Sequence, residues 1–324
     1  MSLGLHTWTI RKAVGGFRLE TVRLRPETPG MHWNKITVIG VGLLGGSLGL
    51  ALKARGLAGS VVGFVRRQAS IDQCRELGVV DWATRELARA VEDADLIVLC
   101  TPIAQMLPLV EQMLPAIKPG AVLTDVGSVK GSVVRELEGP VAEAGGHFIG
   151  SHPMAGAEKT GPAAARPQLF ENAVCIVTPT SNSNPPALEA VEGLWRALGS
   201  KLLRLTPAAH DDLVSRSSHL PHVVAAELAN YVLSAEHPKE QGVLCANGFR
   251  DVTRIASGSP EMWRDIALAN RENLSRAIAM FTKDLADFQS ALQKGDVAAV
   301  SRFFERAKQR RDEWSAQGAC SSPE

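Results

Sequence analysis

The chain has 324 residues, of which 45% are hydrophobic, and this length suits two domains better than one ordinary core. Its 35 basic and 34 acidic residues leave a formal net charge of +1, which gives no electrostatic argument for binding nucleic acid or a membrane surface. The five cysteines are scattered without a C-x-x-C pair. This argues against a disulfide scaffold or a zinc site and fits a cytoplasmic protein without a bound metal.

The amino-terminal segment, residues 1–33, has mixed charge and no long apolar run, so it does not resemble a secretory signal. We expect a flexible extension, or an over-long start upstream of Met31; a weak targeting segment is the less favoured alternative. The apolar run 36–52 is short for a membrane span and holds five glycines. A buried strand, a glycine turn and a buried helix explain it better.

Short β-branched segments alternate with helical ones from residue 34 to residue 207. Seven of them are expected to be strands: 36–40, 60–65, 96–100, 121–127, 147–152, 173–179 and 200–205. Strands that alternate with helices imply βαβ units and a mainly parallel sheet. The sequence therefore predicts an α/β, Rossmann-type dinucleotide-binding domain over residues 34–207.

The first predicted strand leads into the motif GVGLLG, in which Gly40, Gly42 and Gly45 have the G-x-G-x-x-G spacing. Gly40 permits a tight turn, Gly42 lets the backbone approach a pyrophosphate, and Gly45 lets helix and strand pack closely. Leu43 and Leu44 stand at the helix N-terminus, which favours an anion. The motif predicts a nicotinamide dinucleotide; FAD is the main alternative.

The second predicted strand ends with Val65 at the position where NAD enzymes carry an acidic residue. Arg66 and Arg67 follow, and two guanidinium groups there favour the 2′-phosphate of NADP over NAD; the alternative is a pair of solvated loop arginines. At the end of the third expected strand, Thr101 and Pro102 are expected beside the nicotinamide ribose, or else form an ordinary turn.

Two further strand ends carry polar side chains that suit catalysis. Ser128 follows the strand 121–127, and His152 ends the strand 147–152, directly before Pro153. Proline restricts the preceding residue to extended conformations, which helps to fix the direction of the imidazole. In open α/β sheets, ligands bind outside the carboxyl ends of the strands.

The pattern from residue 208 to residue 314 is helical only, and residues 315–324 form a tail. One long helix is expected over 260–294, with Ser259 as N-cap and Gly295 at its end. It carries a stripe at three- or four-residue steps: Trp263, Ile266, Asn270, Leu274, Ile278, Phe281, Leu285, Phe288 and Leu292. Such a stripe needs a partner surface, so we expect a homodimer through this domain; an intrachain bundle is the alternative.

Five motifs together resemble the prephenate/arogenate dehydrogenases of tyrosine biosynthesis. They are GVGLLGGS, DVGSVKG, GSHPMAGAEKTG, SHLPH and FRDVTRIASGSPEMWRDI, and the resemblance covers roughly residues 35–314. It implies an oxidoreductase that acts on a cyclohexadienol, prephenate or arogenate. Hydride leaves ring carbon C4 for NADP while C1 loses CO₂, and the ring becomes aromatic.

The resemblance also implies roles for particular residues. His152 would accept a hydrogen bond from the ring hydroxyl and act as base, and Ser128 would bond the same hydroxyl or orient His152. Arg254 would anchor the substrate's side-chain carboxylate as a planar two-pronged donor. The remaining substrate residues are expected to be His222, Trp263 and, as a gate acting by ion pairing, Glu158. Weaker candidates are His210, His219 and Lys130.

Two other functions remain open from the sequence alone. One is an NADP-dependent dehydrogenase of the β-hydroxyacid type, although the K-x-x-x-N element of those enzymes is absent after His210. The other is a non-catalytic NADP-sensing protein, which would not need His152, Ser128 and Arg254 together. Within the favoured family, an acidic residue near the substrate's ammonium group would favour arogenate, and Asp211 or Asp212 could supply it.

Overall fold

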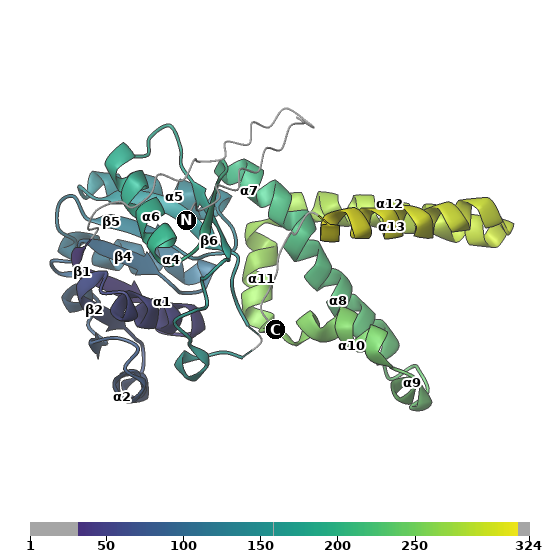
Figure 1. Ribbon diagram of the computed structural model, residues 1–324, viewed down its shortest axis with the longest axis horizontal. Helices are drawn as coiled ribbons and strands as arrows, with labels where there is room; N and C mark the ends of the chain where they lie inside the picture. Colours follow the sequence, from purple (N-terminus) through teal and green to yellow (C-terminus); the bar gives the residue numbers. More distant parts are fainter. Residues whose placement is uncertain (1–31, 158, 317–324) are drawn as a thin grey trace, which may run out of the picture.

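The computed structural model describes residues 32–157 and 159–316. An α/β body forms one side of the molecule, and a helical half extends away from it (Figure 1). Nearly all of the expected extension 1–33, the gate residue Glu158 and the last eight residues of the tail lie outside the described residues.

A single sheet of eight strands forms the centre of the described body, in the order β3-β2-β1-β4-β5-β6-β7-β8. The strands are β1 Trp33–Ile39, β2 Ala58–Phe64, β3 Trp82–Thr84, β4 Leu96–Leu99, β5 Val122–Asp125, β6 His147–Pro153, β7 Val174–Thr178 and β8 Lys201–Arg204. Neighbouring strands run parallel except β6 and β7, which are antiparallel. The predicted Rossmann-type sheet is confirmed; only β3 was missed, because three residues are too few for a periodic pattern.

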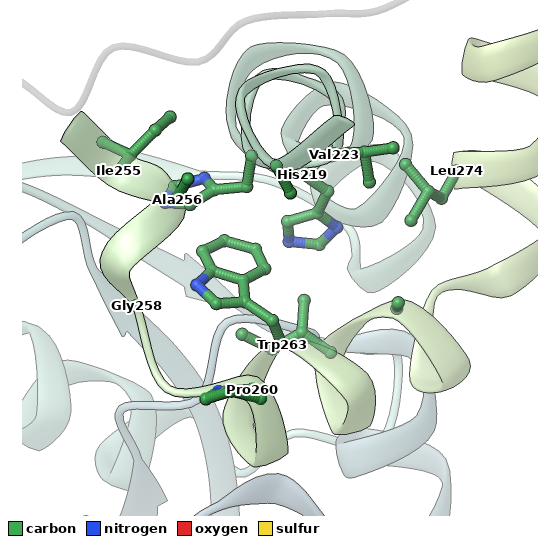
Figure 2. A pocket seen from close by; sticks show the side chains of 12 residues that line it. His219, Val223, Ile255, Ala256, Gly258, Pro260, Trp263 and Leu274 are labelled. Atoms are coloured by element: carbon green, nitrogen blue, oxygen red, sulfur yellow. The ribbon is translucent and has the colours of Figure 1, made fainter. Parts of the chain in front are cut away.

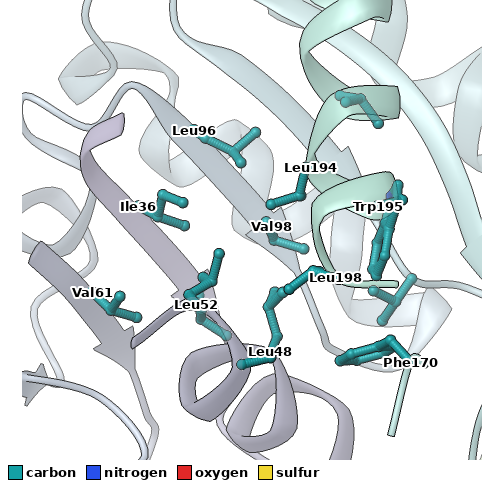
Figure 3. Close-up of a cluster of buried hydrophobic side chains, with 14 of the residues drawn as sticks. Ile36, Leu48, Leu52, Val61, Leu96, Val98, Phe170, Leu194, Trp195 and Leu198 are labelled. Carbon is teal, nitrogen blue, oxygen red and sulfur yellow. The ribbon is translucent and has the colours of Figure 1, made fainter. Parts of the chain in front are cut away.

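Helices cover both faces of this sheet and bury two apolar layers. They are α1 Leu43–Ala54, α2 Gln68–Leu77, α3 Leu87–Val91, α4 Ile103–Met113, α5 Gly131–Glu143 and α6 Pro185–Ala197, with short 3-10 turns η1 Leu114–Ala116 and η2 Pro162–Ala164. On one face, Leu48 and Leu52 of α1 and Trp195 of α6 meet Ile36 and Val98 from the strands (Figure 3). On the other face, α3, α4 and α5 cover a second cluster. Each fully buried aliphatic side chain contributes about 1.5–3 kcal/mol, so both layers hold the strand ends in place.

The helical half begins directly after β8. Its elements are α7 Pro207–Val214, the π-helical turn η3 Ser215–His219, α8 Leu220–Val232, α9 Glu240–Val243, α10 Asn247–Thr253, the 3-10 turn η4 Arg254–Ser257, α11 Pro260–Ala269, α12 Arg271–Lys294 and α13 Val297–Ala316. In Figure 1, α12 and α13 run side by side as an arm that leads away from the body, while α8 to α10 leave in another direction. No described helix is both long and apolar enough to cross a membrane.

The expected helix over 260–294 is two helices, so that prediction was wrong in its middle. Asn270, with φ −113° and ψ 29°, ends α11 and precedes α12. Its side chain is buried, and its Nδ2 donates to the carbonyl oxygen of Asp211 at 2.8 Å. This buried polar contact holds the residue at the break in place against α7. The ends are as predicted: Ser259 accepts from the Met262 amide at 3.3 Å, and Gly295 is left-handed with φ 65°.

Candidate active site

The turn between β1 and α1 is closed on its protein side and open on its outer side. A Cβ atom on Gly40 would lie 2.8 Å from the carbonyl oxygen of Cys100, and one on Gly45 would lie 2.1 Å from the carbonyl oxygen of Gly40. Gly40 also has a φ of 96°, which favours glycine. At Gly42, by contrast, nothing lies within 4 Å of an added Cβ. Only the middle glycine therefore leaves room for another molecule to approach the backbone.

The amino end of α1 can bind an anion at this open position. The amide of Gly46 donates to the carbonyl of Gly42 at 2.9 Å, so the amides of Leu43, Leu44 and Gly45 precede the first intrahelical bond. The first turn has no acidic side chain. Beside the turn, Oγ1 of Thr101 is buried without a hydrogen-bond partner among the described residues. These features fit the phosphate and ribose groups of a dinucleotide.

The end of β2 offers positive charge. Arg66 and Arg67 are exposed at the start of α2, and neither forms an ion pair with another described residue. Val65 supplies no carboxylate, and its side chain is buried in the core. At the end of β4, Pro102 begins α4 as its N-cap residue and follows Thr101 next to the glycine turn.

His152 lies at the end of β6, in extended backbone as Pro153 predicts, and its imidazole is the first of two connected rings. Its Nδ1 lies 2.8 Å from Nε2 of His210 on α7. Nδ1 of His210 lies 2.8 Å from Oδ1 of Asp211. The buried carboxylate of Asp211 in turn accepts hydrogen bonds from the backbone amides of Lys130 at 2.7 Å and Gly131 at 2.8 Å. A continuous series of hydrogen bonds thus joins the end of β6 to the start of α5.

A buried ion pair also connects the end of β5 with β6. The ammonium of Lys130 pairs with the carboxylate of Asp125 and also donates to the carbonyl of Ser151 at 2.9 Å. Asp125 also accepts from the amides of Gly127 at 2.8 Å and Ser151 at 3.1 Å. Removing one partner of such a pair would leave an uncompensated buried charge, so the pair fixes the loop after β5 against β6.

The histidines in this region are neutral at neutral pH. Burial lowers the pKa of His152 well below 6.5, and the neighbouring His210 and Lys130 lower it further. Burial also lowers the pKa of His210, against the opposing effect of Asp211. The pKa of His219 falls to about 4, again mainly because of burial. A neutral imidazole has a lone pair, which a general base requires.

A cavity of about 250 Å³ lies between α8, η4 and α11 (Figure 2). Its wall is largely apolar, with Val223, Ile255 and Leu274 among its residues. Trp263 stacks on His222 with ring centres 3.6 Å apart, and the edge of His219 faces Trp263 at 6.2 Å. The wall also includes the 3-10 turn that follows Arg254. An apolar slot with two imidazoles and an indole suits a flat six-membered ring.

His219, which lines this cavity, has one ring nitrogen without a hydrogen-bond partner among the described residues. Its Nε2 is this nitrogen, and it is buried. Its Nδ1 lies 3.2 Å from Nδ2 of Asn270, which also holds the backbone of Asp211. Asn270 thus connects the cavity with Asp211, the residue at the other end of the imidazole series from His152.

The structure places most of the expected site residues in this region. His222 and Trp263 line the cavity, while Arg254 is exposed at the start of η4, next to the lining residue Ile255. Glu158 lies outside the described residues. Asp211 and Asp212, the expected partners of a substrate ammonium, each have partners within the protein. Backbone amides and His210 bond the carboxylate of Asp211, and Asp212 pairs with Arg216.

Sequence reasoning gave too little weight to several residues of the site. His210 and Lys130 were only weak candidates, and Asp125 and Asn270 had no assigned role. The adjacent letters HDD at 210–212 were an available signal, because an imidazole beside a carboxylate is a common catalytic pair. No comparable signal marked Asn270, which stands at an expected apolar position. Among the described residues, no group of three or more His, Cys, Asp or Glu side chains is arranged to hold a metal.

Comparison with known proteins gives the chain relatives along most of its length. The family model "Prephenate dehydrogenase, nucleotide-binding domain" matches residues 48–204, and "Prephenate dehydrogenase, dimerization domain" matches residues 206–306. A prephenate dehydrogenase of Bacillus subtilis is 34% identical over 280 residues, which are 86% of this chain and 75% of that protein. A cyclohexadienyl dehydrogenase of Zymomonas mobilis is 32% identical over 279 residues, 85% of this chain and 94% of that protein.

A solved structure shows the same arrangement of the two halves. The prephenate dehydrogenase of Aquifex aeolicus, in complex with hydroxyphenyl propionate and NAD⁺, superposes with a TM-score of 0.81 at 30% identity. The match covers 86% of this chain and 98% of that one. With a Rossmann-type domain, a helical domain and both family models in order, the chain belongs to the prephenate/arogenate dehydrogenase family.

Proposed function

We propose that the protein catalyses the oxidative decarboxylation of prephenate, arogenate or both, in tyrosine biosynthesis. The observation that carries this proposal is the neutral His152 imidazole, held at the end of a strand in the same sheet whose glycine turn suits a dinucleotide. Both positions lie at carboxyl ends of parallel strands, where ligands of open α/β sheets bind. Family membership supplies the class of reaction.

His152 would act on the ring hydroxyl of the substrate. A bound nicotinamide supplies the acceptor for the hydride that leaves C4. As C4 loses the hydride, the hydroxyl becomes more acidic and His152 takes a share of its proton. When the bond from C1 to the carboxylate breaks, CO₂ leaves, and the electron pair of that bond stays in the ring and makes it aromatic. The proton then stays on the phenol oxygen, so the reaction needs no lasting proton acceptor.

The other expected residues would hold the substrate against His152. Ser128, half-buried in the loop after β5, would bond the same hydroxyl or orient His152. Arg254 would hold the side-chain carboxylate beside the cavity, and His222 and Trp263 would hold the ring. Glu158 would gate the cavity by ion pairing.

The cofactor would be NADP rather than NAD. Arg66 and Arg67 are exposed where β2 ends, and no carboxylate at residue 65 is present to repel a 2′-phosphate. Gly40, Gly42, Gly45, Leu43 and Leu44 would surround the pyrophosphate. Thr101 and Pro102 would lie beside the nicotinamide ribose.

The protein would work as a cytoplasmic homodimer, formed through the helical domain. Residues 206–306 match a dimerization-domain model, and the arm of α12 and α13 exposes large apolar side chains, such as Met280, Leu285 and Phe304. We place the Rossmann domain at 34–207 and the helical domain at 208–314, a boundary within one residue of the start of α7 at Pro207. The partners would be a small-molecule substrate and a second copy of the chain, and neither nucleic acid nor membrane.

The reaction is tested by following the formation of reduced cofactor by absorbance, with prephenate and with arogenate, each with NADP and with NAD. We expect turnover of one or both substrates. If neither is turned over with either cofactor by a folded protein, the proposed function is wrong.

The substrate anchor is tested by Arg254→Ala, with Arg264→Ala as a matched control on the exposed side of α11. Loss of a charge-assisted bond to the carboxylate should raise KM by an amount equivalent to about 2–5 kcal/mol, with little change in cofactor affinity. Arg264 pairs with Asp265, and its loss should leave KM unchanged. If KM moves equally little in both variants, the carboxylate is bound elsewhere, with Arg250 the next residue to test.

A further inference from the structure

The hydrogen bonds that connect His152 to Asp211 have a direction, which can be deduced from the carboxylate end. Oδ1 of Asp211 accepts from the amide of Lys130 and Oδ2 from the amide of Gly131. Both amides belong to the amino end of α5, where a helix favours negative charge. Both oxygens of this carboxylate are thus hydrogen-bond acceptors, and a carboxylate has no hydrogen to donate to His210.

The position of the single ring hydrogen then follows for each of the two neutral imidazoles. Nδ1 of His210 lies 2.8 Å from Oδ1 of Asp211, so this nitrogen carries the hydrogen. A neutral imidazole carries one hydrogen, and Nε2 of His210 is therefore an acceptor. It lies 2.8 Å from Nδ1 of His152, which must donate. The one hydrogen of His152 is thereby fixed on Nδ1, and its Nε2 keeps a free lone pair.

The surroundings satisfy the two conditions of this deduction. Both rings are neutral, because burial lowers the pKa of each and the ammonium of Lys130 disfavours further positive charge. Water does not compete for the bonds, because His210 is fully buried and His152 is only 7% exposed. The remaining edge of His152, which carries Nε2, is the one not bonded to His210.

We propose that His210 and Asp211 are positioning residues that hold His152 in the tautomer with hydrogen on Nδ1, so that Nε2 accepts the hydrogen bond of the substrate hydroxyl. This proposal rests on the proposed role of His152 as the base. Imidazole in water prefers the other tautomer, in which Nε2 carries the hydrogen and would donate to the hydroxyl. The carboxylate also stabilises the positive charge that His152 acquires while it shares the hydroxyl proton, since Nδ1–H then donates more strongly to His210.

The tautomer can be read directly by ¹⁵N NMR of the full-length protein, labelled at the histidine nitrogens and without substrate or cofactor. We expect His152, identified by the loss of its signals in His152→Gln, to show a protonated Nδ1 and a bare Nε2 at neutral pH. A protonated Nε2, or rapid exchange between both forms, would overturn the proposal. Because the measurement needs no turnover, the expected tautomer in a protein that converts neither dienol would refute the proposed function and leave the tautomer assignment standing.

Two replacements of His210 distinguish positioning from a general structural role. Glutamine carries an oxygen that can accept from Nδ1 of His152 and an NH₂ group that can donate to Asp211, so it can repeat the direction of the original bonds. Asparagine is too short to reach both. We expect His210→Gln to keep the His152 tautomer and kcat within about tenfold, and His210→Asn to lose roughly 10²–10⁴-fold in kcat with KM little changed. If His210→Gln and His210→Asn have the same kcat and the same melting temperature, the proposal is contradicted.

A third comparison tests the charge at the end of the series. Asp211→Asn removes it, and Asp212→Asn is the control, because Asp212 pairs with Arg216 and touches neither ring. We expect only Asp211→Asn to lose kcat, by roughly 10²–10⁴-fold, as a carboxylate-to-amide change does behind a catalytic histidine. Equal kcat in both variants, with both folded, would show that the carboxylate has no part in the chemistry. If Asp211→Asn does not fold, the two His210 variants and the NMR measurement decide.

Discussion

His152 can serve as a base only while its ring is neutral. Its surroundings keep the ring neutral at pH values below the usual pKa of histidine. Burial, His210 and Lys130 all lower its pKa from 6.5. Activity that depends on this base should therefore persist as the pH falls below 6.5, since the neutral form remains. An unperturbed histidine would lose activity in that range.

Replacing His152 by asparagine tests the base itself. We expect His152→Asn to fold and to bind cofactor normally, but to lose kcat by roughly 10²–10⁴-fold, the usual contribution of a positioned acid–base group. Steady-state kinetics and fluorescence titration with the cofactor give the two quantities. Near-normal kcat would show that another group assists the hydroxyl.

The low pKa of His219 has a consequence for stability. Its pKa is about 4 in the folded protein and about 6.5 when unfolded, so the unfolded chain binds more protons between these values. The free energy of unfolding should be unaffected above pH 6.5 and should fall as the pH drops toward 4, by at most roughly 3 kcal/mol from this residue. Urea denaturation across this range should show a smaller pH dependence in His219→Gln than in the native protein. The same slope in both would mean that His219 is not shielded from solvent.

Individual site residues were predictable to the extent that they stand in contiguous motifs. His152 and Ser128 follow predicted strands, and local sequence is enough to place them at the sheet edge. His210 and Asp211 contact residues of the body that are 58 and 81 positions away in the chain. Asn270 contacts Asp211, 59 positions away within the helical half. The pairings of His210 and Asp211 arise only when the helical half packs against the body, and that of Asn270 only when α12 packs against α7. No local pattern encodes either contact.

At the scale of single elements, the break between α11 and α12 shows where helical periodicity misleads. A polar residue at one position of an apolar stripe is compatible with a continuous helix, and the period alone cannot distinguish Asn270 from a tolerated exception. Its buried hydrogen bonds to Asp211 and His219 decide the outcome.

Removing these bonds should destabilise the fold measurably. We expect Asn270→Ala to lower the free energy of unfolding by roughly 2–4 kcal/mol, because the carbonyl of Asp211 and Nδ1 of His219 both lose a buried partner. Gln289→Ala, at an exposed position of α12, is the control and should change it by less than about 0.5 kcal/mol. A small loss in Asn270→Ala would show that the break between the helices does not depend on this side chain.

The connection between β2 and α2 determines the expected preference for cofactor. Each phosphate–arginine contact is worth roughly 1.5–3 kcal/mol, so one good contact predicts about tenfold or more in kcat/KM for NADP over NAD. Changing both Arg66 and Arg67 to glutamine should remove that preference, whereas Arg75→Gln on the same helix should not. If the unchanged enzyme uses NAD equally well or better, the two arginines are only solvated.

At the scale of the whole molecule, the two domain types and their order could be predicted, because alternating strands and helices give way to helices only. What the sequence did not show is how far the helical half extends. Phe281, Leu285 and Leu292 of the stripe remain exposed in one chain, although the stripe as a whole had suggested a covered surface. Local periodicity shows which side chains share one face of a helix, but it does not show whether another chain covers that face.

Light scattering at micromolar concentration should give about twice the mass of one chain, which is 34.6 kDa. A dimer would bury the apolar side chains of the arm, at about 25 cal/mol per Å² of apolar surface removed from water. Leu285→Glu on the exposed face of α12 should weaken the dimer, while Lys283→Glu should not. A monomer across the whole concentration range would mean that these side chains stay in contact with solvent.

The contact between Asp211 and α5 joins the two halves of the molecule close to His210 and His152. Asp211 belongs to the helical half, while the amides of Lys130 and Gly131 belong to the body. A hinge rotation about residues 205 and 206 would draw the carboxylate from these amides and His210 from His152. The relative position of the two halves and the proposed hydrogen pattern on His152 therefore depend on the same few contacts.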